Sequence, residues 1–463
     1  MFGEAELPMP AGEPRQPEAT VKAEPRLMRV QRDQVEFRAC DLDSLLAIDH
    51  PARTVWAFVQ SLDMTAVYAK MKAVEGGPGR PSIDPAILMA LWLWATIDAV
   101  GSAREIDRLC ERDDPYRWLC GGVGMNYHAL ADFRTEHSQW LDAQLTRSIA
   151  SLLDRRLITL NVVSQDGLRV RASVKASSMR RKERLEQLLA EARAQVQALK
   201  SELHEDAGAS TRRKQAARER AVREREQRLT QALAKMRKLE QKDEAKKPTR
   251  KSPRKPTQGK DDPPEPAKPK AKRELRVSPS DPDARVMKMA DGGFRPAFNA
   301  QLVVDADTQI IAAVDLVNIG GDMQQLAPMH AELHSRYGVT PEHWLADGGF
   351  AKFEAIEQLA QQGTQAVVPP PKSRHHPEVD PCAPHEGDSA IIAKLRQFMG
   401  SSEGKTLYRR RAATVECANA QLRRRGLLQF NVRGLLKARA VLLWHALAHN
   451  LMRMTKLNYA FAS

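Results

Sequence analysis

Apolar residues in the first third of the chain recur at the spacing of amphipathic helices. The pattern runs over residues 37–153, and its most apolar segment is residues 87–94. Just before that segment, the sequence GRPSIDP supplies a turn, a serine or aspartate cap, and a proline suited to the first turn of a helix. We therefore predict an all-helical domain over residues 34–150, which is either a DNA-binding domain or a plain structural module, preceded by a disordered Pro-, Glu- and Arg-rich tail over residues 1–33.

Alternating and β-branched residues predict strands farther along the chain. Residues 158–163 form the first of them, after which the chain reaches Asp166 and a glycine and enters a second extended run. The sequence FNAQLVVDADTQIIAAVDLV predicts two strands around a turn at residues 305–308, and HWLAD predicts a short later strand. We expect an α/β domain built from residues 151–179 and 277–463.

Residues 180–276 interrupt this α/β domain. Their first part repeats apolar residues at alternating spacings of four and three, the seam of a coiled coil: Leu185, Leu189, Ala192, Val196, Leu199 and Leu203. The sequence EDAGAS ends this helix and a second one resumes near Arg212, so we predict an intramolecular antiparallel hairpin. From Lys246 the chain becomes a Lys/Pro-rich linker, which cannot pack into a core.

Positive charge is distributed unevenly along the 463 residues, whose net charge is +14. Residues 180–276 contain 30 Lys and Arg against 16 Asp and Glu, whereas the rest of the chain contains 42 of each. The whole surplus therefore lies in the insertion, which favours contact with nucleic acid. The linker has no aromatic side chain to stack on bases, so we expect it to contact phosphates whatever the base sequence.

Composition limits the class of protein further. Hydrophobic residues make up 42% of the chain, enough for a real core. The five cysteines have no paired or zinc-type spacing, which fits a reducing compartment. No amino-terminal segment resembles a signal peptide, and the most apolar run, ILMALWLWATIDAV, is too short to cross a membrane. We expect a soluble, cytoplasmic protein.

The strongest candidate chemistry lies in the sequence YRRRAATVECANAQLRRR, residues 408–425. It places Glu416 among arginines, which favour an ionised acid and attract a polyanion. Arg423 follows two helical turns later, within about 20° of the same face, and Asn419 lies between them. This pattern suits a metal-and-phosphate site. The alternative is a solvated basic helix that carries one incidental glutamate.

Two further acids are candidates for the same site, because hard divalent cations take several oxygen ligands. Asp166 and Asp347 each follow an apolar strand and precede glycine, where open α/β sheets place their ligand sites. Either Asp-Gly pair on its own is more often an ordinary turn. We expect no metal at five other acids that look like turn or cap residues: Asp291, Asp305, Asp307, Asp315 and Asp322. In particular, Asp322 is expected to cap the helix after it. Residues 373–404, with three histidines, favour a polar loop.

Four blocks of sequence resemble, in their order, the bacterial insertion-sequence transposases of the DDE type that begin with a compact helical domain (the insertion-sequence four/five-like superfamily). The blocks are GRPSIDPAILMALWLWATIDAVGSAREIDRLCERDDPYRWLCGG, QDGLRVRAS with Asp166, WLADGGFA with Asp347, and YRRRAATVECANAQLRRRGLLQFNVRGLLKARAVLLWHALAHNLMRM with Glu416. Each block is weak evidence alone, and the ordered set is specific. The resemblance covers most of the chain outside roughly residues 1–35 and 180–275.

This resemblance implies an α/β fold, with a ribonuclease-H-like mixed-sheet catalytic core, an N-terminal all-helical domain and an inserted basic helical hairpin. It implies that Asp166, Asp347 and Glu416 are the catalytic and metal-binding triad. Tyr408 and Arg411 match the tyrosine and arginine that precede the glutamate in the family.

Two departures from the family pattern occur near the glutamate. Arg423 stands where many relatives have lysine, and the tyrosine-to-glutamate spacing is one residue longer than the commonest form. Together with Tyr408, Arg411, Asn419 and Arg424, Arg423 is a candidate DNA contact.

The reaction implied by the resemblance is metal-dependent cleavage of DNA at transposon ends, followed by strand transfer into target DNA. Two Mg²⁺ ions, for which Mn²⁺ substitutes, are the expected cofactors. The expected partners are double-stranded DNA, as terminal inverted repeats and as target, and a second copy of the chain on paired ends in the bacterial nucleoid. The alternatives are a nuclease of the same fold that cuts without joining, and a non-catalytic DNA-binding or scaffold protein.

Overall fold

The computed structural model describes residues 41–71, 73, 81–202, 209–245, 274–372, 378–459 and 461. The predicted disordered tail and the Lys/Pro-rich linker lie outside these ranges, so both stay predictions. From Leu42 onward the chain forms one compact unit.

The amino-terminal part is helical, as the apolar spacing predicts. Its elements are η1 (Asp43–Leu45), α1 (Pro51–Gln60), α2 (Thr65–Tyr68), α3 (Pro85–Ile97), α4 (Ala103–Arg112), α5 (Asp114–Cys120), α6 (Tyr127–Glu136) and α7 (Ser138–Asp154). Of the two candidate caps for α3, Asp84 is the one that serves, because its carboxylate accepts from the backbone N–H of Ala86. Pro85 occupies the first turn, where the helix has no need of its missing N–H.

The strands form one mixed sheet, which comprises β1 (Val162–Arg171), β2 (Arg285–Lys288), β3 (Phe294–Asp305), β4 (Ile311–Val317), β5 (His343–Leu345) and β6 (Gln365–Val367). Strands β1, β3 and β4 pair antiparallel, while β5 pairs parallel with β1 and β6 parallel with β5. Three antiparallel strands followed by two parallel ones is the order expected of the ribonuclease-H-like core. The predicted turn between β3 and β4 is confirmed, with Asp305 accepting from the N–H and hydroxyl of Thr308.

The prediction that Asp166 ends a strand is wrong. β1 continues without a turn through Asp166 and Gly167, and Gly167 pairs with Gln301 of β3. Glycine is needed there for close approach, because a Cβ atom would lie 2.2 Å from Oδ1 of Asp322. The Asp-Gly pair therefore marks a crowded point within a strand.

Helices from the second half of the chain cover the sheet and connect it to the amino-terminal helices. They are α10 (Leu326–Tyr337), η4 (Gly348–Phe350), α11 (Phe353–Gln361), α12 (Ala390–Gly400), α13 (Ser402–Arg411), η5 (Ala412–Glu416), α14 (Cys417–Arg424) and α15 (Leu435–Lys456). α15 packs on β4 and on α3, α6 and α7. Its Trp444 and Leu442 share one apolar cluster with Leu91 of α3 and Trp344 of β5, so the amino-terminal helices and the sheet have a common core.

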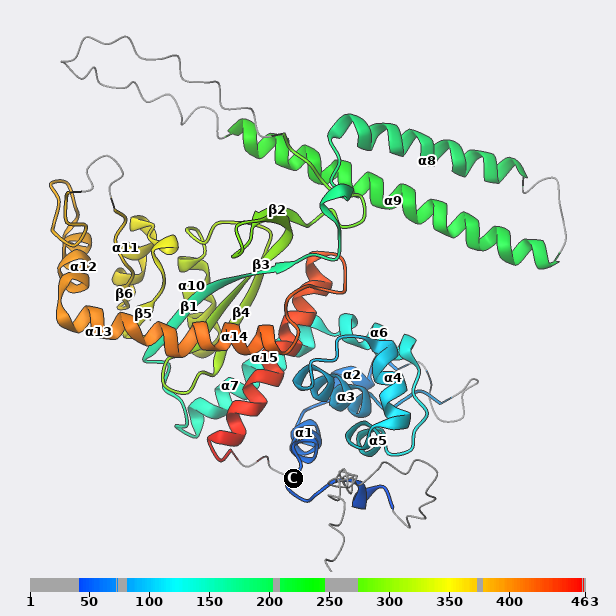
Figure 1. The fold of residues 1–463 in the computed structure, drawn as a ribbon, viewed down its shortest axis with the longest axis horizontal. Coiled ribbons are helices and arrows are strands. Elements are labelled where there is room, and N and C mark those ends of the chain that lie inside the picture. The colour runs from blue at the N-terminus through cyan, green and yellow to red at the C-terminus, as the bar shows by residue number, and fades with distance from the viewer. Residues whose placement is uncertain are drawn as a thin grey trace, which may run out of the picture. The chain divides into compact units, whose positions relative to one another are not determined.

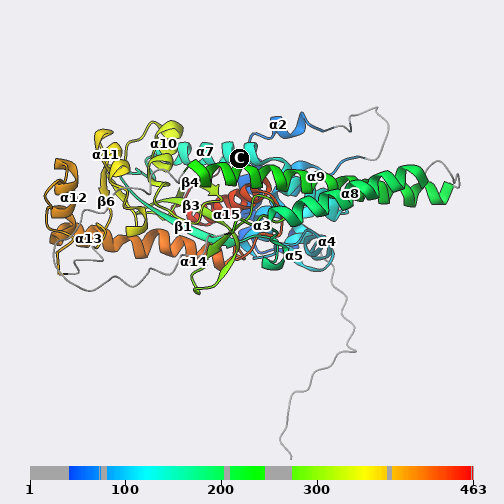
Figure 2. The ribbon, with the colours of Figure 1, turned by 90° about the horizontal axis from the view of Figure 1, so that it is seen from above.

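The insertion leaves the sheet after β1, where η2 (Ala176–Ser178) is followed by α8 (Lys182–Glu202) and α9 (Ala209–Ala245). Leu185, Leu189 and Ala192 of α8 pack against the apolar face of α9 that carries Leu229, Leu233 and Met236. Lys182 at the start of α8 pairs with Glu240 near the end of α9, and Arg193 in the middle of α8 pairs with Glu226 in the middle of α9. The two helices therefore run antiparallel, as predicted (Figures 1 and 2). At the base, Arg180 and Val277 exchange two backbone hydrogen bonds, so the ends of the insertion are adjacent.

Candidate active site

The candidate site forms where α13, η5 and α14 cross the sheet. These three segments follow one another in line, and η5 contacts β1 and β3 (Figure 1). Val415, Ala418 and Leu422 are fully buried, so the apolar side of this helical segment faces the core, as the sequence predicts. This packing places the opposite polar positions over β1.

Asp166 points from β1 toward this helical segment. Its Oδ2 accepts a 2.8 Å hydrogen bond from Nδ2 of Asn419, and its Oδ1 accepts one of 2.9 Å from the backbone N–H of Gly167. The amide of Asn419 thus fixes the orientation of the carboxylate across a sequence separation of 253 residues. The structure therefore brings these two predicted site residues together.

Arg411 joins Asp166 to Glu416. Its guanidinium lies 3.6 Å from Oδ1 of Asp166 and 3.4 Å from Oε1 of Glu416. The Arg411 side chain is 7% exposed, whereas that of Glu416 is 52% exposed. Nη1 also lies 3.5 Å from the hydroxyl of Tyr408, at the outer limit of a hydrogen bond. One buried cation therefore stands between two of the three candidate acids.

Asp347 lies beside Asp166 through the pairing of the parallel strands. Val162, Val163 and Ser164 of β1 pair with His343, Trp344 and Leu345 of β5. Asp347 follows the last paired residue of β5 by two positions, and its charge is near enough to raise the pKa of Asp166. The carboxylate of Asp347 accepts from the N–H of Gly349, which holds it at the start of the glycine turn.

The pKa of Asp166 is raised to about 6, chiefly because burial disfavours the charged carboxylate. Arg411 and the N–H of Gly167 oppose this rise, whereas the charges of Asp347 and Asp322 add to it. Asp166, Asp347 and Asp322 therefore lie close enough for the other two charges to disfavour ionisation of Asp166.

Asp322 is not a helix cap, contrary to the prediction. α10 begins at Leu326, and the buried carboxylate of Asp322 instead accepts from Arg169 at 2.5 Å, Asn299 at 2.7 Å and Gln301 at 2.9 Å. This polar network lies against Gly167, directly beside Asp166. Sequence reasoning missed it, although a glycine inside a strand pattern and two amides on one face of the facing strand were signals for it.

The atoms near Asp166 that could bind a metal ion are oxygens, the ligand type that hard divalent cations prefer. The carboxylates supply oxygen ligands, and Oδ1 of Asn419 is buried without a hydrogen-bond partner. In the part of the chain that the structure describes, however, no three His, Cys, Asp or Glu side chains are grouped so as to hold a metal ion. The Arg411 guanidinium occupies the space between Asp166 and Glu416 where such an ion is expected.

Of the other predicted residues, Tyr408 is half-buried on α13 and lies against Arg411. Arg423 and Arg424 are exposed on α14. The remaining acids have local partners: Asp291 binds Arg295, Asp307 binds Arg410, and Asp315 binds Arg439. The predicted polar loop over residues 373–404 is wrong in its second half, which forms α12 and the start of α13, while residues 373–377 lie outside the described ranges.

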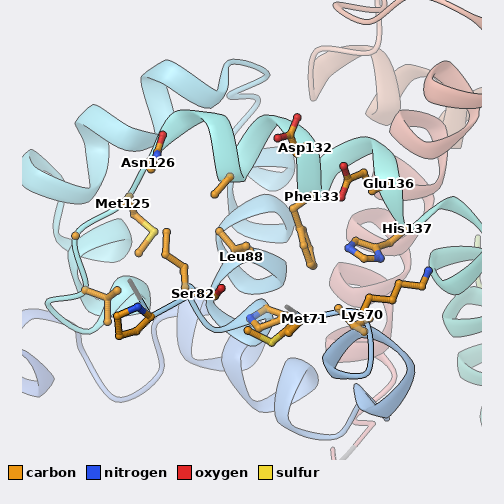
Figure 3. Close-up of a pocket in the computed structure, with 17 residues that line it drawn as sticks. Lys70, Met71, Ser82, Leu88, Met125, Asn126, Asp132, Phe133, Glu136 and His137 are labelled. Atoms are coloured by element: carbon orange, nitrogen blue, oxygen red, sulfur yellow. The ribbon is translucent and has the colours of Figure 1, made fainter. Parts of the chain in front are cut away.

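A separate cavity of about 770 Å³ lies among the amino-terminal helices. Figure 3 shows its lining, which includes Lys70, Leu88, Phe133 and His137. None of its lining residues belongs to the acid cluster, so it is not part of the candidate site.

Two family models match the chain. Residues 270–451 match the transposase DDE domain, and residues 40–136 match a second transposase domain of uncharacterised role. The chain belongs to the DDE transposases of insertion sequences. No curated protein and no solved structure matches it. Asp347 and Glu416 fall within the first match, whereas Asp166 falls outside both, so its placement rests on the geometry above.

Membership of this family establishes the general kind of activity. The chain carries a DNA-acting transposase domain, and DDE domains are generally dependent on divalent metal ions. The ribonuclease-H-like core expected from the sequence is thereby confirmed. Within the described ranges, every helix is too short or too polar to span a bilayer.

Proposed function

We propose that this transposase cuts DNA at the ends of its element and joins those ends to target DNA, with Asp166, Asp347 and Glu416 as the catalytic carboxylates. The observation that carries the proposal is the pairing of β1 with β5, which brings the end of β5 close to Asp166, combined with the Arg411 bridge to Glu416. These contacts support one shared site for three acids from separate parts of the chain.

The chemistry consists of two displacements at phosphorus. Water first attacks the phosphodiester at the end of the element, the bond to the 3′ oxygen breaks, and a free 3′ hydroxyl forms. That hydroxyl then attacks a target phosphodiester, forms the new bond, and releases the 3′ oxygen of the target strand as a hydroxyl. Neither step needs a covalent bond to the protein, so a nucleophilic serine or tyrosine is not required.

When bound, two divalent ions, Mg²⁺ or Mn²⁺, would supply Lewis-acid activation of the attacking oxygen and neutralise charge on the leaving oxygen. Asp166, Asp347 and Glu416 would hold them. Asn419 orients the Asp166 carboxylate through its 2.8 Å hydrogen bond, and its buried Oδ1 has no hydrogen-bond partner of its own. Each of these residues would supply an oxygen ligand or would hold a ligating carboxylate in place.

DNA binding is assigned to exposed positive charge. Arg423 and Arg424 lie exposed on the same helical segment as Glu416, a position suited to contacts with phosphates beside the cut. The insertion supplies further sequence-independent phosphate contacts, and the amino-terminal helices read the terminal repeat. Two chains act on paired ends in the cytoplasm, at the nucleoid.

The test is cleavage of a duplex that carries the terminal sequence of the element, in Mg²⁺ or Mn²⁺. Asp166→Asn, Asp347→Asn and Glu416→Gln should each lower cleavage by about 1000-fold or more, because the acids act as one unit. Asp315→Asn is the matched control, since Asp315 binds Arg439 away from the site, and it should cut normally.

The outcomes separate the competing functions. Joined target product in the wild-type reaction supports the transposase, and cutting without joining identifies a nuclease. Failure of the wild-type protein to cut in either metal points to a DNA-binding scaffold. Normal cutting by any one triad variant removes that residue from the site.

A further inference from the structure

Arg411 is bound more loosely than a permanent structural arginine in this protein. Arg336 is comparably buried, and its guanidinium lies 2.9 and 3.0 Å from the two carboxylate oxygens of Asp142. The contacts of Arg411 to Asp166 and Glu416 are 3.6 and 3.4 Å long, and its buried Nε has no hydrogen-bond partner. Charge-assisted hydrogen bonds are normally about 2.7–2.9 Å long. Arg411 therefore balances the charge of the two acids without forming a short hydrogen bond to either of them.

A local irregularity of the helix aims Arg411 at Glu416. Five residues of a regular α-helix turn the side chain by about 500°, which would leave the two about 140° apart. Residues Ala412–Glu416 instead form a wider π-helical turn, which absorbs one residue and returns Glu416 to the face of Arg411. The wide turn is supported from outside, because Nε2 of Gln309 donates a 2.7 Å hydrogen bond to the carbonyl of Ala413.

This turn can accommodate the longer spacing in the sequence. The tyrosine-to-glutamate distance is one residue longer than the common family form, and the π-helical turn lies between Tyr408 and Glu416. The longer spacing therefore does not remove Arg411 from the site. The π-helical turn keeps the Arg411 guanidinium between Asp166 and Glu416, where a divalent cation is expected.

We propose that Arg411 is the resident counter-ion of the site: it occupies the place of a divalent cation between Asp166 and Glu416 and leaves when a phosphate of bound DNA takes its guanidinium. The free protein then binds divalent ions weakly, and DNA and metal ion bind cooperatively. The identity of the phosphate rests on the proposed function, whereas the competition between Arg411 and the ion does not.

The experiment measures Mn²⁺ binding by electron paramagnetic resonance, with and without a short duplex. Without DNA, Arg411→Gln should bind Mn²⁺ about tenfold or more tightly than the wild-type protein. Arg410→Gln is the matched control: it removes the same charge one residue earlier, where Arg410 binds Asp307, and it should change the affinity less than twofold. The duplex should tighten Mn²⁺ binding to the wild-type protein and leave Arg411→Gln nearly unchanged.

Equal or weaker Mn²⁺ binding by Arg411→Gln would overturn the proposal. If that variant does not fold, Arg411→Lys decides, because one ammonium cannot span both acids: tighter binding than wild type supports the proposal and unchanged binding overturns it. Mn²⁺ should also raise the melting temperature of Arg411→Gln more than that of the wild-type protein. If Arg411→Gln binds Mn²⁺ more tightly than the wild-type protein but the wild-type protein does not cleave DNA, the counter-ion role of Arg411 is upheld. The proposed transposase chemistry is then rejected.

Discussion

The acid site and the α8–α9 hairpin handle charge in opposite ways. At the site, Asp166, Asp322 and Arg411 are largely buried, and their carboxylates and guanidinium depend on a few fixed partners. On the hairpin, pairs such as Arg193 with Glu226 are largely exposed, and the helices are held together by their apolar seam. Exposed ion pairs contribute little, about 0–1 kcal/mol, whereas an unpartnered buried charge is costly.

This difference indicates where a substitution acts. A small change of volume or position at the buried site should affect folding and chemistry together. A change on the hairpin should alter only how strongly the protein attracts a polyanion.

Replacing Gly167 with alanine should have the largest effect. The new Cβ would lie 2.2 Å from Oδ1 of Asp322, whose carboxylate is held by Arg169, Asn299 and Gln301. The network cannot shift freely, so we expect a loss of about 2–4 kcal/mol in the free energy of unfolding, together with loss of cleavage. Denaturant unfolding and the cleavage assay measure the two effects.

The control for this substitution is Gly321→Ala. Gly321 is the neighbour of Asp322, and a Cβ there would meet no atom within 4 Å. It should change the free energy of unfolding by less than about 0.5 kcal/mol. An equal loss in both variants would show that the Asp322 network is not what makes Gly167 necessary.

Deleting the insertion should have the next largest effect, on DNA affinity. Because Arg180 and Val277 are hydrogen-bonded neighbours, residues 181–276 can be replaced by a short Gly-Ser linker without stretching the core. Affinity should fall by about 10- to 100-fold at low salt, and the loss should shrink as salt rises. Discrimination between terminal-repeat and random DNA should change little. A loss of specificity with a constant salt slope would identify the hairpin as the sequence reader.

The same deletion can be divided between the two charged parts of the insertion. α8 contains four Lys and Arg and four Asp and Glu, and α9 contains twelve Lys and Arg and six Asp and Glu. Residues 246–273 contain eleven Lys and Arg and three Asp and Glu. Removing residues 246–273 alone should therefore reduce the salt slope more than removing the hairpin alone.

The π-helical turn allows a deletion with a small expected effect. Removing exposed Ala412 converts the wide turn into a regular one, in which Arg411 and Glu416 are four residues apart and still share a face. Cleavage should stay within about tenfold of wild type. Deleting Ala420 instead rotates fully buried Leu422 out of the core and should abolish activity. Equal loss in both deletions would contradict the role given to the turn.

The sequence correctly predicted the elements that depend on residues close together along the chain. The Asp84 cap, the turn at residues 305–308 and the apolar seam of the hairpin each depend on neighbours within a few residues. The strand position of Asp166 was predicted wrongly, because the need for Gly167 comes from Asp322, which is 155 positions later in the sequence.

The site shows the same limit. Asp166, Asp347 and Glu416 were predicted as site residues from sequence and resemblance, and they stay a prediction. The bridge by Arg411 and the network around Asp322 depend on contacts across the sheet, which spacing along the chain does not encode. The longer spacing before Glu416 was visible, but its meaning required the π-helical turn.

The central claim is that acids from β1, the end of β5 and η5 form one metal-binding site. Anomalous diffraction from a crystal of the protein with a DNA end and Mn²⁺ tests it most directly. The account predicts manganese peaks bounded by Asp166, Asp347 and Glu416, with the Arg411 guanidinium displaced onto a phosphate. Manganese bound elsewhere, with these carboxylates more than about 10 Å apart around a productive DNA end, would contradict it.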